Sequence, residues 1–285
     1  MHARRLGLSL AFAIGLAATL AATAFAIGSA GSSGGAVTLA QLRGVNFVNV
    51  CGFSHRLPDD PIVAPGRPGA SHDHSFVGAR TTSASSTLES LLASPSTCER
   101  PGHTAAYWMP TLLANGQSVA PGSATIYYRR STLDVVRSFP PGFRMIAGDA
   151  MAQTPQSLRV TSWNCGVHGG VRPQSDVPVC PTSKRTALRL HVTFPSCWDG
   201  TNLDSPNHKS HVAYPTRGRC PSTHPVGVPA ITLIYRYPAV TGSISLASGN
   251  QYSAHADFFN SWNQNALESL IDGCLNALRH CQKGT

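Results

Sequence analysis

Charged side chains are scarce in this sequence, and acidic ones are scarcer than basic ones. Asp, Glu, Lys and Arg make up 12% of the 285 residues, which is about half the share usual in globular proteins. Glu and Lys occur three times each. Classical glycoside hydrolysis needs two carboxylates that flank the scissile bond. A hydrolase built from this chain would therefore have to draw that pair mainly from its Asp residues.

Several standard catalytic and nucleotide-binding motifs are also missing. The chain has no G-x-S-x-G elbow and no H-E-x-x-H helix, which argues against a serine hydrolase or a thermolysin-like protease. It has no P-loop and no dinucleotide fingerprint, so we expect no nucleotide partner. The basic residues are scattered and no RNA-binding aromatic signature accompanies them, so we expect no nucleic-acid partner. The formal net charge of +9 instead favours an anionic partner such as an acidic glycan.

The N-terminus is typical of an exported protein. Arg4 and Arg5 precede an uncharged run rich in Leu, Ala and Phe, and Ala24-Phe25-Ala26 fits the small-x-small cleavage pattern. We predict a signal peptide over 1–26 and a secreted protein with no stable membrane association after cleavage. The alternative is an uncleaved anchor that holds the protein at the membrane, because about 20 apolar residues can span a bilayer.

The mature chain is predicted to hold a Gly/Ser/Ala-rich linker over 27–44 and one domain over 45–281. All eight Cys lie after the predicted signal peptide, and an even number in an exported chain indicates up to four disulfides. Zinc-type Cys-x-x-Cys spacing is absent. Proximity in the sequence pairs Cys165 with Cys180, Cys197 with Cys220, and Cys274 with Cys281, which leaves Cys51 with Cys98.

Hydrophobic periodicity predicts a mainly β protein. Residues 187–194 and 231–237 alternate apolar and polar side chains, which is typical of half-buried strands, and we expect both in one sheet. The run 45–53 predicts a first strand, and a bulge near Phe47-Val48 would reconcile its two apolar phases. Asn115-Gly116 is the best hairpin signal, and the strands predicted around it at 107–113 and 124–128 imply a loop longer than two residues.

Helical patterns are few. Residues 263–280 place Leu, Ile and Cys on one stripe, as an amphipathic helix does. Residues 86–94 predict a short helix capped by Ser85 or Ser86. The expected fold is therefore a single β-sandwich-like domain with a C-terminal amphipathic helix and long loops held by disulfides.

The densest set of polar side chains follows the strand at 187–194. Residues 194–215 read F-P-S-C-W-D-G-T-N-L-D-S-P-N-H-K-S-H-V-A-Y-P. A loop this rich in side chains that donate, accept or ligate, mounted on a strong strand, is where function is most often built. We take it as the candidate site.

This block and four others carry a family resemblance. They are S-H-D-H at 71–74, F-P-P-G-F-R-M-I-A-G-D at 139–149, C-P-S-T-H-P-V at 220–226 and H-A-D-F-F-N-S-W at 255–262. Together they resemble the family called domain of unknown function 1996, in the family's order and over nearly the whole mature chain. That family occurs in secreted proteins of fungi and actinobacteria, and in fungi it is often joined to WSC modules associated with cell-wall carbohydrate.

The resemblance implies an extracellular, glycan-facing role and supplies no reaction. This chain has Asn260-Ser261-Trp262 where the family more often has Asn-Gly-Trp, and it has no WSC module. Attachment to a cell wall through such a module is therefore not expected here.

Pairs of closely spaced ligand-type residues predict a possible divalent metal site. His72 and His74 are two residues apart, so on a strand both imidazoles would leave the same face. His255 and Asp257 repeat this spacing. We take His72, His74 and His255 as the candidate metal ligands, and we expect them to share one site with Asp257 and the loop histidines. The alternative is that all of these histidines only make surface or structural hydrogen bonds.

Two function classes stay open at this point. An enzyme would be a polysaccharide lyase, which removes the proton α to a uronate carboxyl, or a glycoside hydrolase with an Asp pair. The candidate catalytic residues are His208, Lys209, His211, Asp199 and Asp257, and the candidate substrate-binding residues are Trp198, Asn207, Tyr214 and Arg144. The alternative is a non-catalytic carbohydrate- or cell-wall-binding protein, because such polar side chains also satisfy the backbone of a long loop.

Overall fold

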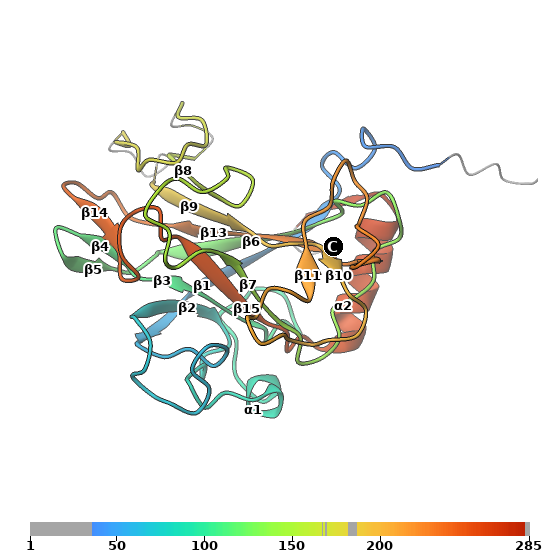
Figure 1. The fold of residues 1–285 in the computed structure, drawn as a ribbon, viewed down its shortest axis with the longest axis horizontal. Helices are drawn as coiled ribbons and strands as arrows, with labels where there is room; N and C mark the ends of the chain where they lie inside the picture. The colour runs from blue at the N-terminus through green and yellow to red at the C-terminus, as the bar shows by residue number, and fades with distance from the viewer. Residues whose placement is uncertain (1–35, 167, 169, 182–186, 283–285) are drawn as a thin grey trace, which may run out of the picture. The chain divides into compact units, whose positions relative to one another are not determined.

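One long strand, β1 (Asn46–Leu57), belongs to both layers of the fold (Figure 1). The structure is a computed structural model that describes residues 36–166, 168, 170–181 and 187–282. The first half of β1 pairs antiparallel with β6 (Ser123–Arg129), and its second half pairs with β2 (His74–Gly78). A single strand therefore connects the two halves of a ten-stranded sheet.

The change of partner along β1 occurs at a β-bulge. The register with β2 shifts between Phe53 and His55. The bulge predicted near Phe47-Val48 is wrong, because these two residues pair in regular register with Tyr128 and Tyr127 of β6. The second apolar phase of β1 therefore faces outwards, where Val48 is only half-buried.

Two layers result, which we call the β6 layer and the β15 layer. The β6 layer combines the first half of β1 with β6, β13 (Ala230–Arg236), β9 (Arg189–Thr193) and β8 (Thr161–Asn164). The β15 layer combines the second half of β1 with β2, β3 (Ala106–Pro110), β15 (His255–Phe259) and β7 (Arg144–Gly148). The pairing of β9 with β13 confirms that the two predicted alternating strands share a sheet.

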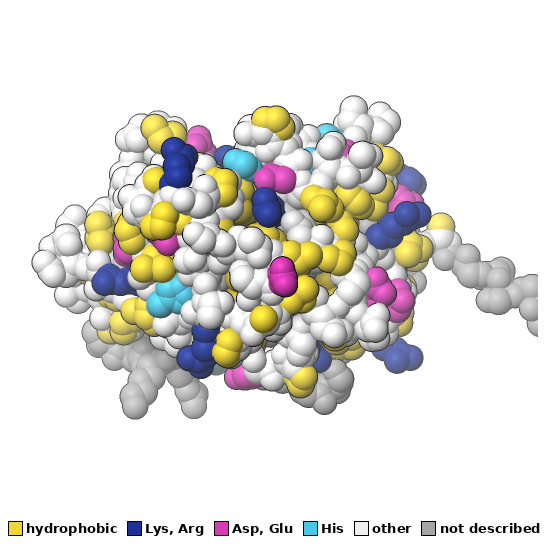
Figure 2. Space-filling model, turned by 90° about the horizontal axis from the view of Figure 1, so that it is seen from below, with side chains coloured by type: hydrophobic (Ala, Val, Ile, Leu, Met, Phe, Trp, Pro, Cys, Tyr) yellow, Lys and Arg dark blue, Asp and Glu magenta, His cyan; other side chains and the backbone are white. Residues whose placement is uncertain are grey.

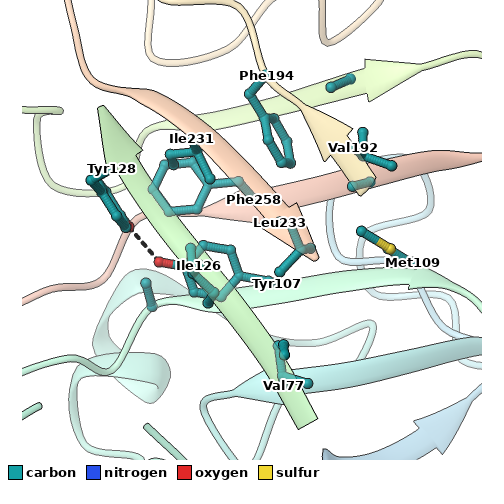
Figure 3. Packing of buried hydrophobic residues seen from close by; sticks show 14 of the residues in the cluster. Val77, Tyr107, Met109, Ile126, Tyr128, Val192, Phe194, Ile231, Leu233 and Phe258 are labelled. Carbon is teal, nitrogen blue, oxygen red and sulfur yellow. Dashed lines mark hydrogen bonds between the residues drawn. The ribbon is translucent and has the colours of Figure 1, made fainter. Parts of the chain in front are cut away.

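Aromatic side chains from the two layers meet in the main core (Figure 3). Phe258 of β15 lies with its ring centroid 6.3 Å from that of Phe194 and 5.2 Å from that of Tyr107. The Tyr107 and Tyr128 hydroxyls hydrogen-bond across the core, which joins β3 to β6. Burial alternates along β6 and β9, whereas β2, β3 and β15 are buried at every position, and the predicted mainly β, sandwich-like fold is confirmed.

Shorter strands form the edges. One three-stranded sheet contains β10 (Cys197–Trp198), β11 (Val212–Ala213) and β12 (Val226–Gly227), and another contains β4 (Leu112–Ala114), β5 (Gln117–Val119) and β14 (Ile244–Leu246). The two-residue strand β16 (His280–Cys281) pairs in parallel with β1. Asn115 and Gly116 form a two-residue turn between β4 and β5, with φ of 50° and 77°, as a type I′ hairpin requires. The longer loop predicted here is therefore wrong, because the short strand β5 pairs with β4 before β6 begins.

Two helical segments complete the fold. The short helix α1 (Leu88–Leu92) is capped by Thr87, whose side chain accepts from the Ser90 N–H, so the predicted Ser caps are wrong by one or two positions. The C-terminal helix α2 (Gln264–Leu270) continues as the π-helical turn η1 (Ile271–Asn276). Its apolar stripe, including Leu267, packs on the main core as the periodicity predicts.

All four predicted disulfides are confirmed, and they join Cys51 to Cys98, Cys165 to Cys180, Cys197 to Cys220, and Cys274 to Cys281. Four disulfides are typical of proteins that fold in an oxidising compartment. The Cys197–Cys220 bond joins the two ends of the polar loop. The predicted signal peptide over 1–26 lies outside the described residues. Among the described residues, none of the helices has the length and apolar character that a membrane crossing requires.

Candidate metal centre

Three imidazoles and two carboxyl groups gather on the outer face of the β15 layer, on the side away from the main core. His74 begins β2, and His255 and Asp257 lie two residues apart on β15, so these two share a face of the sheet. The register aligns Phe76 with Trp108 and Trp108 with Asp257. His74 therefore reaches the same face as Asp257 from two strands away.

The other two side chains, Asp60 and His72, come from the loop 58–73. Ile62 of this loop packs in a second apolar cluster on the outer face of the β15 layer, which holds the loop against the sheet. The Asp59 carboxylate accepts two backbone N–H groups at 2.8 and 2.9 Å and so fixes the loop conformation. Together, the loop and the sheet enclose the five side chains.

The ligand-type atoms of the five residues form two groups of three that share His74. Those of His72, His74 and His255 are within 4.8 Å of one another, and so are those of Asp60, His74 and Asp257. His72 Nε2 is 3.2 Å from His255 Nε2, and His255 Nε2 is 4.0 Å from Asp257 Oδ2. The predicted metal ligands therefore do converge, and Asp257 joins them.

Backbone carbonyls set the tautomers of two of the imidazoles. His74 Nδ1 lies 3.0 Å from the Asp59 carbonyl oxygen, and His255 Nδ1 lies 2.9 Å from the Ser253 carbonyl oxygen. A carbonyl oxygen only accepts, so each Nδ1 carries the proton and each Nε2 directs its lone pair into the cluster. This second-shell arrangement is the usual one for histidines that bind a metal. The Nε2 atom of His74 has no hydrogen-bond partner.

Asp257 is the most unusual member of the cluster. Its side chain is fully buried, and neither carboxylate oxygen has a hydrogen-bond partner. Burial raises the pKa of the Asp257 carboxyl well above its usual range, the nearby Asp60 raises this pKa further, and Lys209 opposes the shift. Burial also raises the pKa of Asp60. A buried polar group that lacks a partner is rare and calls for an explanation.

The pKa values of the imidazoles shift in the opposite direction, downwards. Burial lowers the pKa of His255 to about 3 and that of His74 well below its usual range. The buried site therefore combines neutral imidazoles with carboxyl groups that resist ionisation. A bound cation would stabilise the ionised carboxylates and accept the free lone pairs, which is how metal ions change the electrostatics of such sites.

The donor set indicates a class of metal ion. Imidazole nitrogen with carboxylate oxygen suits Zn²⁺ and its first-row neighbours, whereas Ca²⁺ and Mg²⁺ prefer sites built from oxygen alone. Three His and two Asp exceed the three protein ligands that a catalytic metal needs at minimum. The residues present therefore fit a divalent first-row transition metal ion.

The polar loop lies along the free edge of β7, next to this centre. The backbone N–H of Arg144 donates to the Leu203 carbonyl at 2.9 Å, and the N–H of Ile146 donates to the His208 carbonyl at 3.2 Å. Lys209 Nζ donates to the Gly148 carbonyl at 2.7 Å. The Lys209 ammonium is exposed, and its charge influences both acid–base groups of β15 in the centre.

His208 and His211 have different surroundings. His208 Nδ1 lies 3.0 Å from the Asp204 carboxylate, and the charge of His208 acts on Asp60. His211 is buried, and both of its ring nitrogens have partners, Ser205 Oγ at 2.9 Å and the Arg144 carbonyl at 2.7 Å. His208 is thus near the centre, whereas His211 stabilises the loop.

The other predicted site residues make contacts within the loop or on neighbouring strands. Asp199 accepts two backbone N–H groups of its own turn, and Asn207 does the same two turns later. The Trp198 indole donates to the Asn202 carbonyl, and the Tyr214 hydroxyl donates to the Thr193 carbonyl. The Arg144 guanidinium lies 4.4 Å from the centroid of the Phe259 ring. Their predicted catalytic or substrate roles stay predictions.

A pocket of about 290 Å³ adjoins the centre on the side of the loop. Lys209 and Asp149 line it, together with Ile146, Gln156 and Tyr214. Asp149 and Lys209 both act electrostatically on His255. None of the five donors lines this pocket, but Gly148 in its wall pairs with His255 across the β7–β15 ladder.

Sequence reasoning missed Asp60 as a member of the centre. Its signal was the Asp pair between two prolines in Pro58-Asp59-Asp60-Pro61, because two rigid residues around two carboxyl groups fix their direction. Asp59 was missed for a different reason. Its carbonyl orients His74, and backbone atoms leave no mark in a sequence.

The family pattern described as "Domain of unknown function (DUF1996)" matches residues 60–262. The chain belongs to this family. The match begins at Asp60 and includes the other four donors of the centre. No match was found among the curated proteins or among the solved structures.

Proposed function

We propose that this DUF1996 protein is a secreted metalloprotein that acts on an acidic polysaccharide, with a divalent first-row metal ion held by His72, His74, His255 and Asp257. Asp60 supplies a further carboxylate to this set. One observation carries the proposal. The Asp257 carboxylate and the His74 imidazole belong to one group of fully buried ligand-type residues, and neither the carboxylate oxygens nor His74 Nε2 has a hydrogen-bond partner. A cation is the ligand that satisfies all of these atoms at once.

The reaction class that fits best is elimination at a uronate. A bound metal ion would supply Lewis acidity towards the uronate carboxylate. The protein's own residues would bring the sugar to the pocket next to the centre, where Lys209 presents an exposed ammonium group beside Asp149. In its neutral amine form Lys209 would take the proton α to the carboxyl while the bond between the β carbon and the glycosidic oxygen breaks, and the ammonium so formed would return the proton to the departing oxygen. Removal of Arg4 and Arg5 with the predicted signal peptide lowers the formal charge from +9 to +7, which still favours the approach of such a substrate.

A second function is supported by the depth of the centre. Four of the five donors have exposed fractions of 3% or less, namely Asp60, His74, His255 and Asp257, and the fifth, His72, is partly exposed. A metal ion enclosed in this way suits a structural site, which has no open position for substrate. In that case the protein binds cell-wall glycan without turnover.

Metal content tests the first part of the proposal. Elemental analysis of the secreted protein, purified without chelators and then equilibrated with Zn²⁺ or Mn²⁺, should find about one ion per chain. Asp257→Asn, which keeps the shape of the side chain and removes its charge, and His74→Ala should each lose most of the metal. The control is His280→Ala, because His280 is exposed and only contacts a backbone carbonyl. Equal metal content in the wild type and in both centre variants would refute the centre.

Turnover tests the second part. Metal-loaded protein is incubated with polyuronates, and the ultraviolet absorbance of an unsaturated uronate product is followed. An eliminating enzyme should give a signal that both Asp257→Asn and Lys209→Met abolish, although Lys209→Met should keep its metal. A protein that holds the metal, binds the polymer and gives no product on the panel would instead have the non-catalytic function.

A further inference from the structure

A second group of chemically active side chains lies on the outer face of the β6 layer, away from the metal centre. It contains Tyr127 and Arg129 of β6, Arg189 and His191 of β9, and Arg236 of β13, and we call it the arginine face. Burial alternates along β6 and β9. The members of the arginine face on these strands therefore point outwards, and the residues next to them in the sequence point into the core. Arg129 is exposed, and the other members are partly exposed.

Cross-strand pairing brings the members of the arginine face together. Arg236 and Arg189 lie directly opposite each other on β13 and β9, and His191 lies opposite Ile234 one row further along. The charges of Arg189 and Arg129 both act on His191, whose pKa burial lowers to about 4. The Arg129 guanidinium lies 4.5 Å from the centroid of the Tyr127 ring. Arg189 and Arg236 are therefore direct neighbours, whereas Arg129 lies opposite Ala230, further along the same face, with its charge still acting on His191.

No acidic side chain balances these charges. Within the part of the chain that the structure describes, Arg56 forms an ion pair with Asp73, and two His–Asp contacts join His208 to Asp204 and His255 to Asp257; none of these involves the arginine face. The Nε atoms of Arg189 and Arg236 and the Nε2 atom of His191 have no hydrogen-bond partner. Like charges directly opposite each other on neighbouring strands destabilise a sheet. The Arg189 guanidinium packs against Gly166, but ion pairing within the described residues does not offset the repulsion between Arg189 and Arg236.

We infer that the arginine face is a binding surface for a polyuronate, that is, an extended polysaccharide that carries carboxylate groups at regular intervals. Guanidinium groups bind carboxylates through two parallel hydrogen bonds, which Lys cannot do. Neighbouring strands lie about 4.8 Å apart, so Arg189 and Arg236 present two adjacent guanidinium groups, and Arg129 presents a third further along the face. The hydroxyls of Thr125 and Thr193 on the same face can bond sugar hydroxyls.

Other polyanions fit this surface less well. A membrane-binding surface needs apolar side chains that insert between lipids. The large apolar side chains that are exposed in the described residues are Leu39, Val63, Leu92, Val135, Met151, Leu158, Val179 and Leu203, and none belongs to β6, β9 or β13. Single-stranded nucleic acid needs several free aromatic rings for base stacking. Tyr127 is the aromatic member of the face, and Arg129 already covers its ring.

The side of the molecule with α1 gives a useful contrast. Figure 2 views that side from below, and there basic and acidic side chains are scattered among neutral ones. Arg67 and Arg80 belong to the loops after β1 and β2, outside the β6 layer, and both are exposed. Replacing this pair changes the net charge by the same amount as replacing Arg189 and Arg236. The chain therefore offers a matched control for a purely non-specific charge effect.

The test is a binding titration of the full secreted protein with polygalacturonate, with the methyl-esterified polymer as the neutral reference. The double variant Arg189→Gln with Arg236→Gln should bind polygalacturonate at least about tenfold more weakly, a change of 1.4 kcal/mol. Arg129→Gln should weaken binding in the same direction. The control pair Arg67→Gln with Arg80→Gln should change the Kd by less than about twofold. The metal content of all these variants should equal that of the wild type, so this result is independent of the metal centre.

Three outcomes would overturn the inference. The control pair could weaken binding as much as the face variants do, which would reduce the effect to net charge. The face variants could bind the polymer as tightly as the wild type. The wild type could bind duplex DNA or anionic phosphatidylserine vesicles more tightly than polygalacturonate. Folding is monitored by thermal unfolding, and removal of the repulsion between Arg189 and Arg236 should leave the melting temperature equal or raise it.

Discussion

The substitution Asp257→Asn distinguishes two effects of the buried carboxyl group: its cost to folding stability and its contribution to metal binding. The folded-state pKa of Asp257 is raised by burial above its unfolded value. The stability that this group contributes is therefore fully present below the unfolded pKa, and it is lost as the pH rises towards the folded pKa. The loss is about 1.4 kcal/mol for each pH unit crossed. At neutral pH the metal-free wild type carries this penalty, and the neutral Asn side chain does not.

Metal binding should reverse the order of stability. At a free metal concentration of about 100 times the Kd, binding stabilises the folded wild type by about 2.7 kcal/mol. For a chain of this size that corresponds to a rise in Tm of about 5–10 °C. The Asn variant lacks a ligand from the centre of the donor set and should gain much less. We therefore expect the variant to be the more stable protein in chelator and the less stable one in metal.

The assay is thermal unfolding followed by circular dichroism at pH 7, first in excess chelator and then in excess Zn²⁺ or Mn²⁺. His280→Ala serves as the control and should follow the wild type under both conditions, because its imidazole is exposed and remote from the donor set. A metal-free Asp257→Asn protein that unfolds below the wild type would refute the electrostatic reasoning. An equal response of both proteins to metal would refute Asp257 as a ligand.

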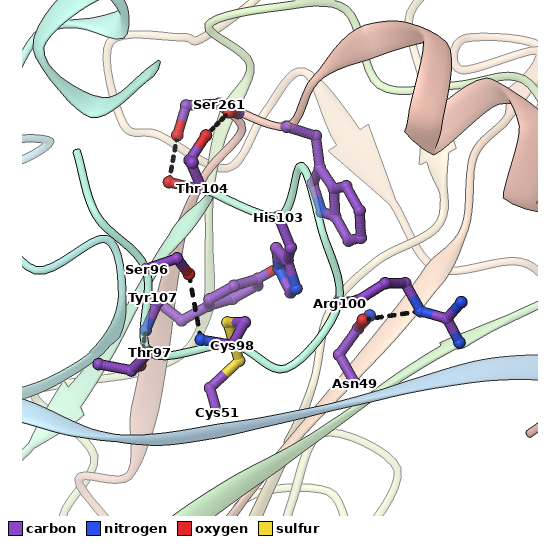
Figure 4. Close-up of a disulfide and its surroundings, with 12 residues drawn as sticks. Asn49, Cys51, Ser96, Thr97, Cys98, Arg100, His103, Thr104, Tyr107 and Ser261 are labelled. Atoms are coloured by element: carbon purple, nitrogen blue, oxygen red, sulfur yellow. Dashed lines mark hydrogen bonds between the residues drawn. A yellow bond between two sulfur atoms is a disulfide. The ribbon is translucent and has the colours of Figure 1, made fainter. Parts of the chain in front are cut away.

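Two further predictions concern residues outside the metal centre. His103 is fully buried beside the Cys51–Cys98 disulfide and hydrogen-bonds Tyr107 (Figure 4), and burial lowers its pKa well below 6.5. The neutral imidazole therefore contributes its full stability above pH 6.5, and this contribution is lost as the pH falls, by up to about 1.4 kcal/mol per pH unit. His103→Gln should reduce the slope of the unfolding free energy against pH below 6.5, measured by urea denaturation. An unchanged slope would contradict this. Removal of the Cys197–Cys220 disulfide by a double Ala substitution should lower the unfolding free energy by about 3 kcal/mol, from loop-closure entropy. The same protein should keep its metal, because the donors lie outside that loop, and metal loss equal to that of Asp257→Asn would show that the loop holds the centre.

Local patterns in the sequence predicted much of the fold. The alternations at 187–194 and 231–237 identified β9 and β13, because the side-chain period of a strand is a local property. The Asn115-Gly116 turn follows from the positive φ that both residues tolerate. Three of the disulfides were predicted from the short sequence separation of their cysteines. Cys51 and Cys98 are 47 residues apart in the sequence, and their pairing was predicted only because no other partner remained.

Details that depend on a partner strand were beyond such reasoning. The bulge of β1 lies between Phe53 and His55 rather than at Phe47-Val48, because β1 changes partner there from β6 to β2. An apolar run with two phases is compatible with either position. The choice is made by the second layer, whose place in space no single segment encodes.

The sequence by itself determined that this protein has an even set of cysteines, a mainly β fold and pairs of ligand-type residues at strand spacing. Only the tertiary structure decided that His72, His74, His255 and Asp257 meet, that Asp60 joins them, and that His211 does not. The physical reason is that a residue's chemistry depends on what surrounds it. Whether a carboxyl group is solvated or buried without a partner is settled by segments about 200 residues apart, here the loop at 58–73 and the strand β15.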